Sequence, residues 1–99
     1  DSAENGIRAG ARVLRTYRLK YGLKTIAAII PRYAPNSENN TAAYIASVSK
    51  QTGYAPNAGL LFTLDAYVPL IKAIIYHENG QNPYDDATII RGAKAGLLL

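Results

Sequence analysis

The stretch that decides the fold is NGIRAGARVLRTYRLKYGLKTIAAII, residues 5–30. Its apolar side chains recur every three or four residues, the spacing that places them on one face of a helix. They are Ile7, Ala11, Leu14, Tyr17 and Tyr21. Gly22 follows at once, and glycine is the residue type that most often ends a helix. The stretch therefore predicts one long amphipathic helix that stops at Gly22.

The remainder of the chain repeats this pattern in shorter segments. We expect a second helix from about Thr25, short or kinked because Pro31 lies inside its apolar pattern. Three more are expected at 41–51, from 63–65 to Gly80, and after residue 85. The fold class is all-α, a single compact domain of about five short helices. The expected core is Ile7, Leu14, Ile26, Ile30, Tyr44, Ile45, Val48, Ile71, Ile74, Ile75, Ile89 and Ile90, with Val68 on the fourth helix.

Polar residues at the expected helix ends predict the caps. Asp1 would cap the first helix with Glu4 completing a capping box, and Asn40 or Thr41 would cap the third. Asp85 or Asp86 would cap the fifth. Pro69 is compatible with the fourth helix only in its first turn, where no N–H is required.

Composition narrows the classes of function. The chain has 99 residues, 48% of them hydrophobic, with no cysteine and one histidine. Disulfides and thiolate or histidine-cluster metal sites are thereby excluded, and no cofactor is expected. No apolar run approaches the roughly 18 residues of a membrane span. The net charge of +4 favours an anionic partner, which leaves open nucleic acid, cell-wall polymer or an acidic protein face.

Basic residues concentrate in the first helix. Arg8, Arg12 and Arg15 follow an i, i+4, i+7 spacing and share one face, which we interpret as a partner-binding surface. The alternative is the solvated face of an amphipathic helix. Nucleic-acid binding is only weakly indicated, because the eight tyrosines form no regular stacking platform.

A second candidate site lies in KAIIYHENGQNPYDD, residues 72–86. Glu78 closes an apolar run, and Gly80 with Asn82 and Pro83 follows it. This pattern resembles the segment in which lytic transglycosylases present their catalytic acid, although Asn79 replaces their serine. The resemblance implies a lysozyme-like helical lobe with Glu78 as general acid and base, modulated by His77 or Tyr84. The alternative is a helix end and a turn, with Glu78 in a structural hydrogen bond or an ion pair to Arg91 or a first-helix arginine.

Three blocks carry a broader resemblance, at residues 5–30, 33–53 and 73–86. The most specific are RYAPNSENNTAAYI and HENGQNPY. In this order they resemble a family of small virion structural proteins of tailed bacteriophages and prophages. The resemblance implies localisation in the phage particle (the virion), with other virion proteins or a second copy as partners. Peptidoglycan is the substrate under the alternative of a muramidase or lytic transglycosylase.

In that family a segment of Asn-Pro-Gly-Asn type precedes the part that corresponds to DSAENGIRA, residues 1–9. The resemblance therefore predicts that the chain is the C-terminal portion of a longer polypeptide.

Overall fold

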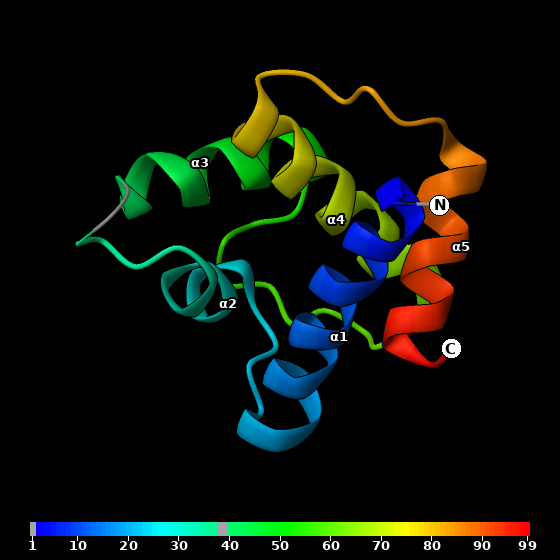
Figure 1. Cartoon of the computed structure of the whole chain (residues 1–99). Coiled ribbons are helices and arrows are strands. Elements are labelled where there is room, and N and C mark those ends of the chain that lie inside the picture. The colour runs from blue at the N-terminus through cyan, green and yellow to red at the C-terminus, as the bar shows by residue number, and fades with distance from the viewer. Residues whose placement is uncertain (1, 38–39) are drawn as a thin grey trace.

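The computed structural model describes residues 2–37 and 40–99. Five helices follow one another in this part of the chain: α1 (Ser2–Tyr21), α2 (Ile26–Tyr33), α3 (Thr41–Thr52), α4 (Leu64–Asn79) and α5 (Asp86–Leu97). No strand occurs among the described residues. The all-α prediction is confirmed. In Figure 1, α1 and α5 lie side by side, and α4 lies in the middle of the molecule, between this pair and α3.

The helix ends follow from local chemistry. Thr25, Asn40, Thr63 and Asp85 each accept a hydrogen bond from a backbone N–H of the first turn of the helix that follows. Gly22, Gly53 and Gly80 end α1, α3 and α4 with φ angles of 68°, 77° and 72°, a region that glycine adopts without strain. The predicted cap by Asp1 lies outside the described residues.

Helix α4 is the centre of the core. Six of its side chains are buried, among them Tyr67 and Leu70, which are fully enclosed. Pro69 lies in the second turn of α4, so the expectation that this proline requires the first turn is wrong. Helix α2 tolerates Pro31 in the same way, and its eight residues agree with the predicted short helix.

Ten of the thirteen expected core residues are buried, whereas Tyr67 and Leu70 are fully buried without having been expected, and three expected residues are not buried. Ile90 is 41% exposed, and Ile45 and Val68 are only half-buried. Each of them lies one position away from a fully buried residue on its helix, namely Ile89, Tyr44 and Tyr67. Adjacent helical residues differ by about 100° in direction, so only one of each pair can face the core. The sequence pattern therefore drew the buried face too wide on α3 and α5, and on α4 it selected Val68 in place of Tyr67.

Two glycines bring α1 and α5 into close contact. A Cβ atom at Gly92 would lie 2.8 Å from Ile7 Cβ, and one at Gly96 would lie 2.5 Å from Ala11 Cβ. Gly92 faces Ile7, and four residues later Gly96 faces Ala11, so α1 and α5 run in the same direction. Arg12 donates from Nε to the carbonyl of Gly96 at 3.1 Å, which satisfies one of the unpaired carbonyls at the C-terminal end of α5.

Candidate functional site

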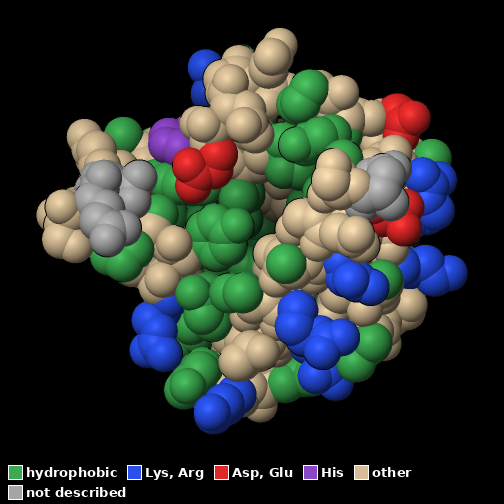
Figure 2. Space-filling view, viewed as in Figure 1, with side chains coloured by type: hydrophobic (Ala, Val, Ile, Leu, Met, Phe, Trp, Pro, Cys, Tyr) green, Lys and Arg blue, Asp and Glu red, His purple; other side chains and the backbone are tan. Residues whose placement is uncertain are grey.

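A groove of about 230 Å³ lies between α1 and α4. We call it the α1–α4 groove. Gly6 and Gly10 of α1 form one wall, and the buried side chains of Ile71, Ile74 and Ile75 of α4 form the other. Figure 2 shows apolar side chains around a hollow in this face of the molecule. The groove is thus mainly apolar and is open to solvent.

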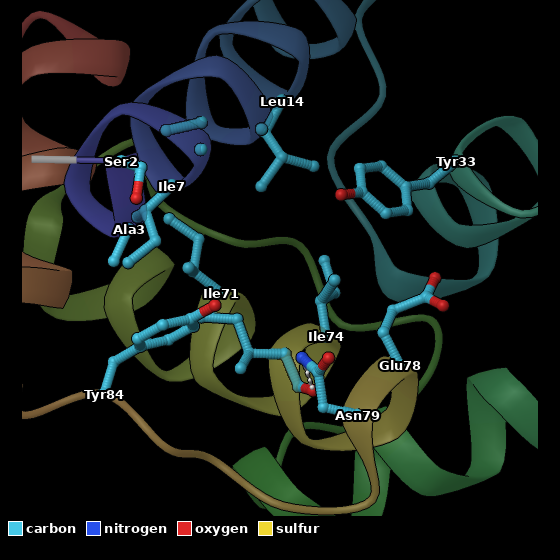
Figure 3. Close-up of a pocket in the computed structure, with 14 residues that line it drawn as sticks. Ser2, Ala3, Ile7, Leu14, Tyr33, Ile71, Ile74, Glu78, Asn79 and Tyr84 are labelled. Atoms are coloured by element: carbon cyan, nitrogen blue, oxygen red, sulfur yellow. Dashed lines mark hydrogen bonds between the residues drawn. The ribbon is translucent and has the colours of Figure 1, made fainter.

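Polar side chains are placed at the two ends of the α1–α4 groove. Figure 3 shows Tyr33 and Glu78 near one another at one end and Tyr84 at the other. Tyr33 comes from the end of α2, Glu78 from the last turn of α4, and Tyr84 from the segment that connects α4 to α5. Three separate segments therefore build this site.

The carboxylate of Glu78 is held by a residue that sequence reasoning assigned only to the core. Tyr44 of α3 donates its hydroxyl hydrogen bond to Glu78 Oε1 at 3.0 Å, while its ring is fully buried. His77 stacks on this ring, with the centroids 3.9 Å apart. The predicted structural hydrogen bond of Glu78 is confirmed. Arg91, which was a suggested partner under the alternative of an ion pair, pairs instead with Glu4 at 2.6 Å.

The tyrosines around Glu78 are neutral hydroxyl donors. Burial raises the pKa of Tyr44 above its ordinary value of 10.0, and the hydrogen bond to Glu78 raises it further. Burial also raises the pKa of Tyr33, with a smaller contribution from the negative charge of Glu78. Glu78 itself is exposed at the rim of the groove, above a floor of isoleucines. The end of the groove therefore carries one carboxylate and two neutral phenols.

The three predicted partner-binding arginines lie along α1, away from Glu78, in different environments. Arg8 is exposed, Arg12 binds the carbonyl of Gly96, and Arg15 is half-buried. The Nε atom of Arg15 is buried without a hydrogen-bond partner in the described part of the chain. Only Arg8 is both exposed and without a hydrogen bond in the described structure that involves its side chain.

The described residues show neither a cluster of metal ligands nor a membrane-spanning helix. They contain no group of three or more histidine, cysteine, aspartate or glutamate side chains placed to hold a metal ion. Within residues 2–37 and 40–99, no helix is long and apolar enough to cross a bilayer.

Sequence reasoning missed Tyr44 and Tyr33 as parts of the site. Tyr44 precedes Glu78 by 34 residues, and its spacing indicates only a core position on α3. A local motif cannot reveal such a pair, because the packing of α3 on α4 brings the two side chains together.

Comparison with known proteins shows that the chain is similar to a phage protein. The chain is 48% identical over 93 residues to Protein P5 of Pseudoalteromonas phage PM2. The match covers 94% of this chain and 57% of that protein, so the chain spans little more than half the length of its relative. No family model matches the chain. This match confirms the predicted similarity to a phage protein, whereas the predicted similarity to lysozyme-like domains is not shown.

Proposed function

We propose that this chain is a structural module of a phage particle and that it binds other particle proteins. The observation that carries the proposal is the 48% identity to a phage protein over 94% of the chain, which includes nearly the whole helical domain. A match of this extent covers core, caps and loops together and so supports a shared fold and setting.

Two surfaces are suited to the proposed contacts. The first is the predicted arginine face of α1, where Arg8 is exposed and Arg15 is half-buried. The second is the α1–α4 groove, whose apolar walls remain open to solvent. Arg12 contributes less to a partner contact, because its guanidinium already binds the end of α5. The partner is either another particle protein or a second copy of this chain.

The direct test is whether the chain co-purifies with assembled phage particles. Purified particles would be separated on a density gradient, dissociated in mild denaturant, and the complexes that contain this chain identified by mass spectrometry. We expect to find the chain in the particle fractions and, after dissociation, in complexes with a small set of particle proteins. A chain present in the lysate but absent from the particles would contradict the proposal.

A second candidate function is cleavage of peptidoglycan with Glu78 as general acid and base. The geometry that favours it is the carboxylate of Glu78 at the rim of a groove, oriented by Tyr44. Against it, Glu78 is the only carboxylate that lines the groove in the described structure, and most glycosidases require two. Asp85, the nearest alternative in sequence, caps α5.

The two candidates are separated by one assay. Under the structural function, the purified chain releases no muropeptides from peptidoglycan. Release that disappears in Glu78→Gln would support the enzymatic function, provided that the variant remains folded. Glutamine keeps an oxygen that can accept the hydrogen bond of Tyr44, so the fold should be preserved.

A further inference from the structure

The wall that α1 contributes to the α1–α4 groove lacks side chains where the groove is open. A Cβ atom built at Gly6 would have no neighbour within 4 Å, and one at Gly10 would meet only Tyr33 Oη, at 3.6 Å. Ile71 and Ile74 face this gap from α4 (Figure 3). The α1–α4 groove, with its volume of about 230 Å³, can therefore take an unbranched aliphatic chain along its length.

The carboxylate of Glu78 at one end of the α1–α4 groove forms no ion pair within the described part of the chain. Among the described residues, Glu78 is the only charged side chain that lines the groove. Between side chains of the described residues, the ion pairs are Lys72 with Asp86 and Arg91 with Glu4. Glu78 therefore has no cationic partner in this part of the chain. The hydroxyl of Tyr44 occupies only one of the several acceptor positions of its carboxylate.

The surroundings of Glu78 increase the preference for a positive charge. Glu78 lies in the last turn of α4, where the negative end of the helix dipole favours cations. Tyr33 adds an aromatic ring at the same end of the groove as Glu78 (Figure 3), and such rings attract cations through their faces. An anion would be repelled here, and a neutral sugar would leave the carboxylate without a counter-charge.

We propose that the α1–α4 groove binds a lysine side chain of a partner protein, with its alkyl stem between Gly6 and Ile74 and its ammonium group at Glu78. This inference rests on the proposed partner-binding function and identifies the chemistry that the groove recognises. A lysine fits both parts of the site, because it joins an apolar stem to a compact charge with three hydrogen-bond donors.

The test is an NMR titration of the isotope-labelled chain with a defined probe, the peptide acetyl-Ala-Lys-Ala-amide. The comparison peptide is the same sequence with the lysine Nε-acetylated. We expect saturable shifts of the backbone amides of Gly6, Gly10 and Glu78 with the lysine peptide. Acetylation should weaken binding by about tenfold or more, the usual effect of losing a hydrogen bond between charged groups.

Variants test the two halves of the site separately. Glu78→Gln should weaken binding of the lysine peptide by about tenfold, while Asp65→Asn, at an exposed carboxylate elsewhere on α4, should leave it unchanged. Gly6→Leu should block the α1–α4 groove without unfolding the chain, because nothing lies where its side chain begins and leucine is a strong helix former. Circular dichroism would verify that each variant is folded.

Several outcomes would overturn the inference. Equal affinity for the two peptides, or unchanged affinity in Glu78→Gln, would exclude a lysine site. Saturation of the same amides by N-acetylglucosamine oligomers but not by the lysine peptide would identify a sugar site instead. If the chain is found in particles but binds neither peptide, this inference fails and the proposed function stands. If the chain binds the lysine peptide but is absent from particles, the proposed function fails and the lysine site stands.

Discussion

Tyr44 joins the core to the rim of the groove. Its ring is fully buried between α3 and α4, and its hydroxyl reaches the exposed carboxylate of Glu78. Removing the hydroxyl would leave the packing of the ring intact, and water would then replace Tyr44 as the hydrogen-bond donor to Glu78. We therefore expect Tyr44→Phe to cost about 1 kcal/mol at neutral pH, the typical net value of one hydrogen bond.

The raised pKa of Tyr44 predicts a loss of stability in alkali. Above pH 10.0 the unfolded chain releases the phenolic proton while the folded chain retains it, so the stability present below this pH falls as the pH rises toward the folded pKa. Tyr44→Phe should reduce this decline, measured by urea unfolding at about pH 8 and about pH 11. Tyr76→Phe, at an exposed tyrosine of α4, is the control. An equally steep decline in Tyr44→Phe and wild type would contradict the prediction.

At the scale of elements, the pairing of α1 with α5 depends on the absence of two side chains. Gly92 and Gly96 allow the backbones to approach, and Arg12 and Glu4 then connect the two helices through Gly96 and Arg91. Parallel neighbouring helices place like ends of their dipoles together, which is unfavourable. The bond from Arg12 to the end of α5 offsets part of that cost.

Two glycine substitutions on this helix pair should have opposite effects. Gly96→Ala places a Cβ atom 2.5 Å from Ala11 Cβ and 3.0 Å from the backbone nitrogen of Arg12, so the helices must separate. We expect a loss of about 1–3 kcal/mol in unfolding free energy. Gly6→Ala meets no atom within 4 Å and should stabilise α1 by about 0.5–1 kcal/mol. Denaturant unfolding measures both, and a stabilised Gly96→Ala would show that the close approach is not required.

At the scale of the molecule, charge is divided along the chain. Residues 5–37 contain seven lysines and arginines and no acidic residue. In Figure 2 most of the visible Lys and Arg side chains lie in the lower half of the face, whereas the acidic side chains lie in the upper half together with a few basic ones. The helical domain therefore presents a basic surface built mainly by α1 and α2, which suits an acidic partner.

This surface predicts a salt-dependent association that two arginines control. Replacing Arg8 and Arg15 with glutamine should weaken binding to particle proteins at low salt and reduce its dependence on ionic strength. Arg12 is left unchanged because it holds the end of α5. The matched control replaces Lys50 and Lys94, two exposed lysines on α3 and α5, and removes the same charge. If binding of the two double variants depends on ionic strength in the same way, this face of α1 is a solvated surface and does not bind the partner.

The sequence by itself determined the helices, their caps and the class of the fold. Apolar spacing, the cap residues Thr25, Asn40 and Asp85, and the glycines at helix ends are local signals, and the hydrogen bonds that they form are local as well. The sequence also located Glu78 at a helix end and predicted its hydrogen bond without its partner.

Only the tertiary structure decided what surrounds Glu78 and which face of each helix is buried. The contact of Tyr44 with Glu78, the groove beside Gly6 and the close approach at Gly96 all join segments far apart in the chain. Helical spacing gives the direction of a side chain to within about one residue, so it placed both Ile89 and Ile90 in the core although only Ile89 is buried. Such contacts depend on how whole helices pack, and no local pattern specifies the rotation and depth at which they meet.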